Sequence, residues 1–217
     1  MGKESWVPLV DEFGKFNGKM VERGRVHSPN LDFNVIVPNS HGALFKNIGG
    51  EIYQGVQQRA KGKKYLGNEW VPLSAGGHLD DKDLTRTFIR GQFIDYKSGM
   101  SREYEEELGI LVPVKDIRRV RDLCGLYDFS EHAGFPMKLW METFYTIYNP
   151  RRHGEIKLNH LEVQNFEFIP VSEVIERGIY DNLSPEYAEK LRERMEEIAE
   201  NLKGHTKYSG GLGDFAA

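Results

Sequence analysis

The chain has 217 residues, enough to bury the core of one sizeable domain. Its formal net charge is -4, and 39% hydrophobic with 29% charged residues is the composition of an ordinary globular protein without a basic field for nucleic acid. The single cysteine, Cys124, excludes an internal disulfide and a cysteine-based zinc site, and no stretch approaches the roughly 18 apolar residues of a membrane span. We therefore expect a cytoplasmic protein with no nucleic-acid or membrane partner.

The first half of the chain has the pattern of a series of short strands. They are predicted at residues 6–10, 19–23, 33–37, 43–45, 56–59 and 70–73. Pro38 is expected to end the third strand, and Asn39–Gly42 to form a turn before the chain returns. Lys61–Lys64 is expected to be a solvated basic loop.

An acidic helix is predicted around residues 102–108. Its glutamates recur at i, i+3 and i+4 and therefore share one helix face: Glu103, Glu106 and Glu107. Tyr104 and Leu108 give the opposite face apolar side chains to bury, and Gly109 stands where a left-handed helix cap is required. Many acidic helix faces are only solvated surface. Three carboxylates on a helix packed from behind nevertheless favour a site for a hard divalent cation.

The second half of the chain continues with strands and ends in a helix. Strands are predicted at residues 118–124, 140–148 and 166–170, followed by a short helix at 171–177. The last helix, residues 184–203, has Ser184 as its N-cap and Pro185 in its first turn. Residues 205–217 have the composition of a mobile tail. We therefore predict a single α/β domain over residues 1–204, with a mixed sheet between helices.

The acidic helix also resembles a family signature. The Nudix hydrolase signature reads G-x5-E-x7-R-E-U-x-E-E-x-G-U, where U is a bulky aliphatic residue, and its second half matches Arg102–Ile110 with Tyr104 in the first U position. The resemblance implies a Nudix-type α/β/α sandwich. It also implies a divalent-metal-dependent hydrolase that cleaves a diphosphate linkage in a nucleoside diphosphate derivative or similar small molecule. Its metal, Mg²⁺ or alternatively Mn²⁺, would be held by Glu103, Glu106 and Glu107, and Arg102 would orient a glutamate through an ion pair.

The first half of the signature fits with an insertion. From Gly77 to Arg102 is 102 − 77 = 25 positions, against 14 in the signature, which leaves 11 additional residues. Six positions beyond Gly77 stands Asp83, and eight before Arg102 stands Ile94, so neither position holds the expected glutamate. Asp83 and Asp95 are both candidate substitutes. The insertion is expected to enlarge the loop or to add a helical turn, and to carry whatever is particular about the substrate.

Further landmarks are Val10–Lys15, Gly18-Lys19, Arg25–His27, Phe33–Val35, Gln58-Arg59, Gly67–Trp70 and Gly76–His78. Together they resemble isopentenyl-diphosphate isomerase and its hydrolase relatives over about residues 7–175. This resemblance implies substrate contacts at four positions: Gln58, Arg59, Gly77 and His78. The isomerase itself needs a cysteine where Ser74-Ala75 stand. Of its metal ligands, His27, His78 and Glu142 are present, whereas Asn34 and Trp140 replace the other two.

Hydrolysis requires a general base, which the resemblance places either among the glutamates of the signature or in a later loop. The later candidates are Glu162 first, then Glu142 and Glu155. Two other functions stay open. One is an isomerase-like enzyme acting on isoprenoid diphosphates, and the other is a non-catalytic module that senses a nucleotide, which the lengthened loop would suit. The resemblance also allows a homodimer.

Overall fold

The computed structural model describes residues 5–32, 34–87 and 91–208. Its strands are β1 (Trp6–Val10), β2 (Phe16–Glu22), β3 (Ile36–Ile48), β4 (Glu51–Arg59), β5 (Trp70–Val71), β6 (Ala75–His78), β7 (Leu84–Thr87), β8 (Gly91–Ile94), β9 (Arg118–Arg119), β10 (Gly125–Asp128), β11 (Lys138–Ile147) and β12 (Val163–Pro170). Its α-helices are α1 (Tyr96–Leu108), α2 (Ser130–Ala133), α3 (Pro150–His153), α4 (Val171–Glu176) and α5 (Pro185–Tyr208). Short 3-10 helices cover Arg23–Arg25, Asp81–Asp83, Val114–Asp116, Arg121–Leu123 and Ile179–Asn182.

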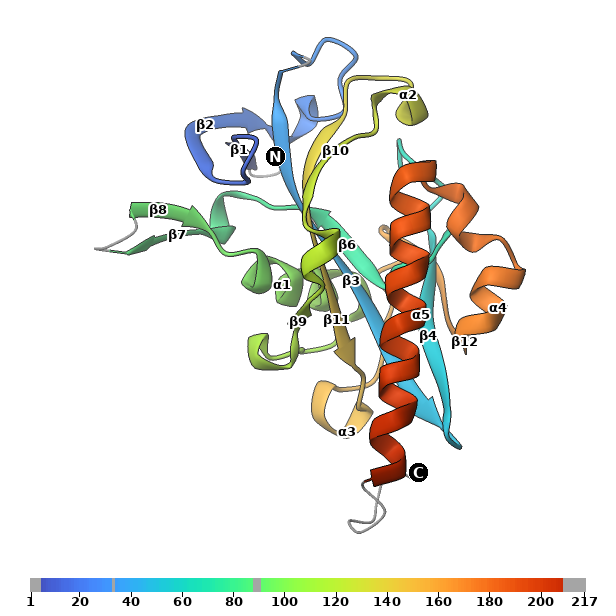
Figure 1. Ribbon diagram of the computed structural model, residues 1–217. Helices are drawn as coiled ribbons and strands as arrows, with labels where there is room; N and C mark the ends of the chain where they lie inside the picture. The colour runs from blue at the N-terminus through green and yellow to red at the C-terminus, as the bar shows by residue number, and fades with distance from the viewer. Residues whose placement is uncertain (1–4, 33, 88–90, 209–217) are drawn as a thin grey trace.

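A mixed sheet forms the middle layer, with helices on both of its faces (Figure 1). Strand β11 pairs in parallel with β3, whereas β4, β6 and β1 pair with β3 in the antiparallel sense. Two hydrophobic cores fill the spaces between the layers. One contains Met100, Tyr104 and Leu108 of α1, and the other contains Tyr187 and Leu191 of α5. The predicted α/β/α sandwich with a mixed sheet is confirmed.

Strand β3 runs through the proline that was expected to end it. Asn39–Gly42, predicted as a turn, pairs with β6 on one side, while β11 pairs with the strand on its other side. The carbonyl of Pro38 accepts from Leu79 N at 3.2 Å. The nitrogen of a strand residue points to the same side as its carbonyl, and on this side Pro38 lies between the residues paired to β1 and those paired to β6. The absent N–H therefore costs one possible hydrogen bond, to Leu79 O at the end of the β6 pairing, and leaves the pairing of Asn39–Gly42 intact.

The predicted strand at residues 118–124 is wrong. Only Arg118 and Arg119 belong to a strand, β9; a 3-10 turn follows at Arg121–Leu123, and the next strand is β10. The reason is packing: the side chain of Leu123 is fully buried in the core that also contains Tyr187 and Leu191, and Cys124 N turns back to donate to Arg121 O at 3.1 Å. Local β-propensity was overridden by this tertiary contact.

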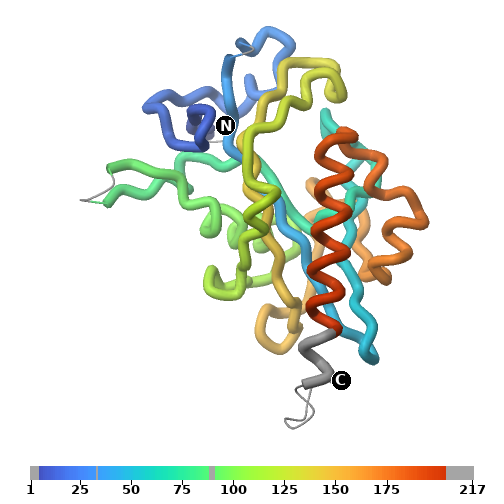
Figure 2. Tube along the Cα trace, in the orientation of Figure 1, coloured from blue at the N-terminus to red at the C-terminus, as the bar shows by residue number. Residues whose placement is uncertain are grey.

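The described residues of the insertion form two antiparallel strands, not an enlarged loop or a helical turn. Strands β7 and β8 pair in a separate two-stranded sheet that projects from the side of the molecule (Figure 2). Asp95 N donates to Asp83 O at 2.9 Å, so the chain leaves and re-enters the domain at one place. The inserted segment is therefore residues 84–94, bracketed by the two aspartates.

Helix α1 is fixed against β3 by its apolar face. Met100, Tyr104 and Leu108 are fully buried, and each such side chain contributes about 1.5–3 kcal/mol of transfer free energy. A Cβ on Gly42 of β3 would lie 2.4 Å from the Tyr104 hydroxyl, so only glycine permits this close approach. Gly109 ends the helix with φ 66°, in the predicted left-handed cap, and its N–H donates to Glu105 O at 3.0 Å.

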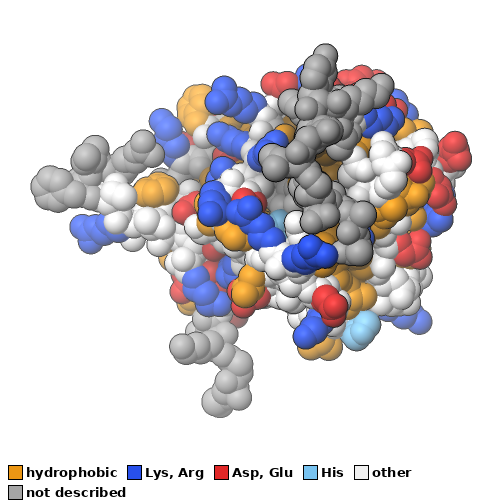
Figure 3. Space-filling model, turned by 90° about the horizontal axis from the view of Figure 1, so that it is seen from below, with side chains coloured by type: hydrophobic (Ala, Val, Ile, Leu, Met, Phe, Trp, Pro, Cys, Tyr) orange, Lys and Arg blue, Asp and Glu red, His pale blue; other side chains and the backbone are white. Residues whose placement is uncertain are grey.

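The last helix is longer than predicted. α5 extends to Tyr208 instead of ending at residue 203, because Gly204 weakens a helix by only about 1 kcal/mol and removes no backbone donor. The remainder of the predicted tail, residues 209–217, lies outside the described residues. Among the described helices, none is long and apolar enough to cross a membrane. On the face seen from below, charged side chains of both signs are interspersed with hydrophobic ones (Figure 3).

Candidate active site

A cavity of about 320 Å³ opens where α1, β6, the β4–β5 loop and the N-terminal end of α5 meet. Its lining contains three carboxylates, Glu103, Glu107 and Glu162, and four cations, Arg23, Arg59, Lys63 and Lys64. A further part of its lining is apolar, including Val71, Leu73, Phe129, Met137, Leu139 and Leu183. Acids, cations and an apolar wall in one concave space are typical of a small-molecule site. None of the described residues of the β7–β8 hairpin lines the cavity, and the expectation that the insertion carries what is particular about the substrate stays a prediction.

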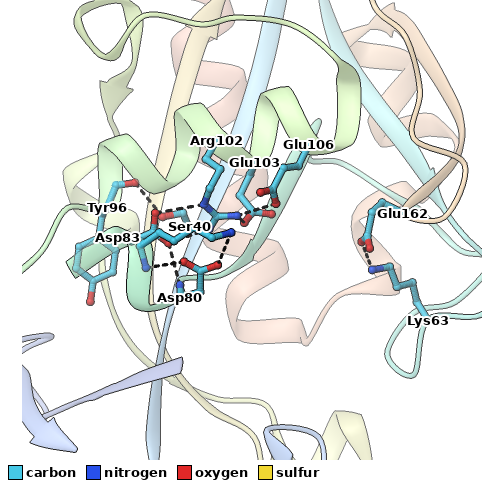
Figure 4. A network of polar contacts seen from close by, with 10 residues as sticks. Ser40, Lys63, Asp80, Asp83, Tyr96, Arg102, Glu103, Glu106 and Glu162 are labelled. Carbon is cyan, nitrogen blue, oxygen red and sulfur yellow. Dashed lines mark hydrogen bonds and ion pairs between the residues drawn. The ribbon is translucent and has the colours of Figure 1, made fainter. Parts of the chain in front are cut away.

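Arg102 is the centre of an ion-pair network on α1 (Figure 4). Its Nη2 and Nε donate to the two carboxylate oxygens of Asp83 at 2.8 and 3.3 Å. Its Nη1 donates to Glu106 Oε2 at 2.7 Å and lies 2.9 Å from Glu103 Oε1. Arg102 thus orients glutamates through ion pairs, and the acid opposite it is Asp83. Asp95, the other candidate, caps α1 instead by accepting from Ser98 N.

Asp83 is positioned by its own short helix. Asp80 N donates to Asp83 Oδ2 at 2.8 Å, and the Asp83 side chain is only 4% exposed. Because the 3-10 turn Asp81–Asp83 contacts α1 in space, the shorter aspartate side chain reaches the guanidinium of Arg102. A buried bidentate pair of this kind fixes the direction of the arginine.

Glu103 and Glu107 are the two box glutamates that face the cavity. Each is only 4% exposed. Glu107 Oε2 is buried without a hydrogen-bond partner, whereas Glu103 Oε1 lies in the ion pair with Arg102. Burial raises the pKa of both carboxyls above the ordinary glutamate value, and neighbouring carboxylates raise them further. A Cβ on Gly77 of β6 would lie 2.6 Å from Glu103 Oε2, so glycine is required for this carboxylate to lie against the strand.

The donor set fits a hard cation, although the third glutamate is turned away. Oxygen atoms that are buried, acidic and unpartnered are suitable ligands for Mg²⁺ or Mn²⁺. The carboxylate of Glu106 pairs with Arg102 and does not line the cavity. Accordingly, within residues 5–32, 34–87 and 91–208 no three His, Cys, Asp or Glu side chains stand in a ready ligand arrangement.

Of the predicted substrate contacts, Arg59, Gly77 and His78 line the cavity and Gln58 does not. Gln58 Nε2 donates to Asn68 O at 3.0 Å, and its Oε1 accepts from Asn165 Nδ2 at 2.6 Å, so this side chain ties the loop and β12 to β4. Its neighbour Gln57 faces the cavity, with its Oε1 unpartnered. Because side chains alternate along a strand, a cavity position for Arg59 implies one for Gln57.

Two histidines on the cavity wall share a short contact. His27 Nε2 and His78 Nε2 lie 2.7 Å apart, and Asn39 Nδ2 lies 3.2 Å from His78 Nδ1. Burial, followed by the nearby charge of Lys64, lowers the pKa of His27 to about 4, and burial also holds the pKa of His78 well below its usual value. Both rings are therefore neutral at physiological pH.

Of the residues that an isomerase would need, His27 and His78 lie together, but the others do not join them. Glu142 does not line the cavity; its carboxylate pairs with Arg119 Nη2 at 2.6 Å. Ser74, at the position of the isomerase cysteine, is fully buried and links Leu44 N to Gly55 O. Cys124 lies elsewhere, with its Sγ 3.2 Å from Arg119 Nε.

Among the three candidate bases, only Glu162 lines the cavity. Its carboxylate pairs with Lys63 of the β4–β5 loop, at some distance from the Arg102 network (Figure 4). Glu142 is the partner of Arg119, and Glu155 is exposed outside the cavity. The loop Lys61–Lys64, predicted to be solvated, contributes Lys63 and Lys64 to the cavity wall.

Solved structures with the same architecture identify the fold. The Nudix domain of Shewanella oneidensis NrtR, solved in complex with ADP ribose, superposes with a TM-score of 0.50 at 16% identity over 78% of this chain and 94% of that one. The chain has the Nudix fold. DR0079 from Deinococcus radiodurans is similar as well, with a TM-score of 0.54 at 16% identity over 87% of this chain and 98% of the other. No protein-family model and no curated protein matches the sequence.

The Nudix fold gives the network around Arg102 a simple interpretation. Asp83 stands six positions after Gly77, where the Nudix signature has its first glutamate, and it pairs with Arg102 of the second half. The hairpin interrupts the signature between these two residues without separating them in space. Sequence reasoning named Asp83 only as one of two candidates, and its spacing from Gly77 was the signal that distinguished it.

Proposed function

We propose that the protein is a divalent-metal-dependent Nudix hydrolase that cleaves a diphosphate linkage in a nucleoside diphosphate derivative or a similar small molecule. The observation that carries this proposal is the buried pair Glu103 and Glu107, two carboxylates that line the same cavity as four cationic side chains. Two adjacent carboxylates with little exposure are unfavourable unless they share a proton or bind a cation.

Glu103 and Glu107 would hold the metal, with Mg²⁺ as the first choice and Mn²⁺ as a substitute. Arg102, fixed by Asp83, neutralises Glu106 and orients Glu103 from behind. A divalent cation would supply neutralisation of the diphosphate and a lowered pKa for the attacking water. Glu106 is placed to join the ligand set only if its carboxylate leaves Arg102.

The cationic side chains of the cavity lining suit the substrate's phosphates. Arg59 and Lys63 present cationic groups there, and a guanidinium can bind phosphate oxygens bidentately. Glu162 is the proposed general base, because it is the candidate glutamate that lines the cavity. It would accept a proton from the attacking water, a step that typically contributes about 10²–10⁴-fold to the rate.

The test is a screen of nucleotide sugars, dinucleoside polyphosphates and ADP-ribose with Mg²⁺ or Mn²⁺, read by released phosphate and by product masses. We expect cleavage of at least one diphosphate, abolished by EDTA. Isopentenyl diphosphate belongs in the same screen. Double-bond migration without phosphate release, or tight nucleotide binding without hydrolysis in either metal, would contradict the proposal and favour an isomerase or a sensing module respectively.

A further inference from the structure

Lys63 and Glu162 form an ion pair at the rim of the cavity (Figure 4). Both side chains line it, and they are 26% and 36% exposed. The proposed general base is thus held by a cation from a different part of the chain. A carboxylate bound in this way is a poorer proton acceptor than a free one.

The backbone of Glu162 is fixed relative to α1. Asn159 N donates to Glu107 O at 3.0 Å, and Glu162 N donates in turn to Asn159 O at 2.8 Å. On its other side, Glu162 O accepts from Ala60 N at 2.9 Å. The position of Glu162 is therefore set by hydrogen bonds to the end of the acidic helix and does not depend on Lys63.

The loop that carries Lys63 is also well defined. Leu66 and Asn68 have left-handed φ values of 53° and 70°, and a Cβ on Gly67 would lie 2.5 Å from Lys63 O. Left-handed conformations of non-glycine residues persist only where the surrounding structure enforces them. The part free to change partner is therefore the flexible four-carbon side chain of Lys63.

The charges around Lys63 favour an anionic ligand. Arg23, Arg59 and Lys64 line the same cavity. Partial burial, followed by the charge of Arg59, lowers the pKa of Lys63. One carboxylate, that of Glu162, is its described ion-pair partner. A diphosphate has more negative charge than a carboxylate and would also neutralise the neighbouring cations.

We propose that Lys63 is a substrate-binding residue whose counterion in the free protein is Glu162, and that the diphosphate takes Lys63 from Glu162. This inference rests on the proposed function. Glu162 then accepts a proton from the water whose oxygen bonds to phosphorus. The bridging P–O bond breaks, and its electron pair leaves with the departing phosphate. Substrate binding thereby frees Glu162 to act as the base. Until a diphosphate is present, Glu162 stays paired with Lys63.

The first test is kinetic. We expect K63M to raise KM about tenfold, the equivalent of one lost ion pair of about 1.4 kcal/mol, with kcat within about threefold of the wild type. K63R should restore KM. K61M is the matched control, because Lys61 is exposed on the same loop and does not line the cavity. A fall in kcat at unchanged KM would show that Lys63 merely holds Glu162 in place, and would overturn the proposal.

The second test does not depend on turnover. Methylenediphosphonate, a diphosphate analogue that cannot be hydrolysed, is bound with Mg²⁺ to the wild-type protein and the complex is crystallised. We expect Lys63 Nζ within about 2.7–3.2 Å of a phosphonate oxygen and no longer on Glu162. An unbroken Lys63–Glu162 pair in that complex would refute the transfer even if the protein hydrolyses diphosphates. Conversely, if Lys63 binds the phosphonate in the crystal but the protein hydrolyses no diphosphate in the screen, the proposed function alone is refuted.

Discussion

At the scale of single residues, Asp83 shows how a shortened side chain keeps its role. The signature has a glutamate at this position, and aspartate is one methylene shorter. The 3-10 turn Asp81–Asp83 compensates by placing the backbone close to α1, so that both carboxylate oxygens reach Arg102. Arg102 is consequently held between Asp83 and the glutamates, with 16% of its side chain exposed.

Replacing Asp83 tests this positioning. D83N should lower the free energy of unfolding by roughly 2–4 kcal/mol, because it leaves a buried guanidinium with one carboxylate fewer. It should also lower kcat/KM about 10–100-fold, since Arg102 no longer orients Glu103. Urea denaturation and steady-state kinetics measure the two effects. D81N is the control, because Asp81 is exposed on the same turn, and we expect it to change stability by less than about 0.5 kcal/mol. Wild-type kcat/KM in D83N would remove Asp83 from the site.

The carboxyl pair on α1 predicts how stability depends on pH. The folded-state pKa values of Glu103 and Glu107 are raised, so the folded protein binds more protons than the unfolded chain once pH exceeds the ordinary glutamate value of about 4.3. Their contribution is present at low pH and is lost as pH rises through the raised pKa. Buried histidines with lowered pKa act in the opposite direction near neutrality, and therefore the prediction concerns the difference between wild type and E107Q.

In EDTA, the stability of the wild type relative to E107Q should fall as pH rises from about 5 to 9. Mg²⁺ should reverse that fall in the wild type only, because the deprotonated pair is the form that binds metal. Urea denaturation at a series of pH values, with EDTA or with Mg²⁺, measures both. A difference between the two proteins that stays constant across this range would contradict the assigned environment of Glu107.

At the scale of elements, the hairpin is an addition that leaves the active-site geometry intact. The chain enters the hairpin after Asp83 and leaves it at Asp95, where α1 begins. The described residues of the hairpin do not line the cavity. Its first and last residues, Leu84 and Ile94, pair with each other. The acidic helix is therefore fixed by the sheet and by its own cap, not by the inserted segment.

Shortening the hairpin tests this independence. Residues 85–93 can be replaced by Asn-Gly, which favours the two-residue turn that would close the Leu84–Ile94 pair. We expect the variant to fold and to retain metal-dependent hydrolysis within about tenfold, a change of about 1.4 kcal/mol in barrier height. Circular dichroism and the hydrolysis assay are the measurements. Complete loss of hydrolysis in a folded variant would mean that the hairpin takes part in the reaction.

The elements also show where sequence reasoning succeeds and where it fails. The acidic helix, its Gly109 cap and its buried face follow from local spacing, and the structure has all three. Two strands were predicted in place of β3, with a break at Pro38, because the sequence does not reveal where the pairing of a strand with its neighbour ends. Gln58, and not Gln57, was predicted to contact the substrate, because the sequence does not show which face of a strand points into a cavity. The Lys63–Glu162 pair joins residues 99 positions apart, and no local pattern indicates such a contact.

At the scale of the whole molecule, the sheet separates two cores and the cavity draws on both sides of that division. Glu103 and Glu107 come from α1, whereas Leu183 and Tyr187 come from the segment that packs on the other face. The charged groups of the described cavity also come from different segments: Glu103 and Glu107 from α1, and Lys63 and Lys64 from the β4–β5 loop. Under the proposed function this arrangement would bring a metal and a diphosphate next to each other. The chain has this fold although it is only 16% identical to DR0079 and to the NrtR domain.

The most direct test of the account compares two single substitutions on α1. With a diphosphate found in the screen and saturating Mg²⁺, E107Q should hydrolyse it at least about 100-fold more slowly, because loss of a metal ligand removes several kcal/mol of stabilisation from the transition state. E105Q makes the same chemical change at an exposed position of the same helix, and its rate should stay within about twofold of the wild type. Hydrolysis at the wild-type rate by folded E107Q would contradict the assignment of the buried glutamate pair as the metal site.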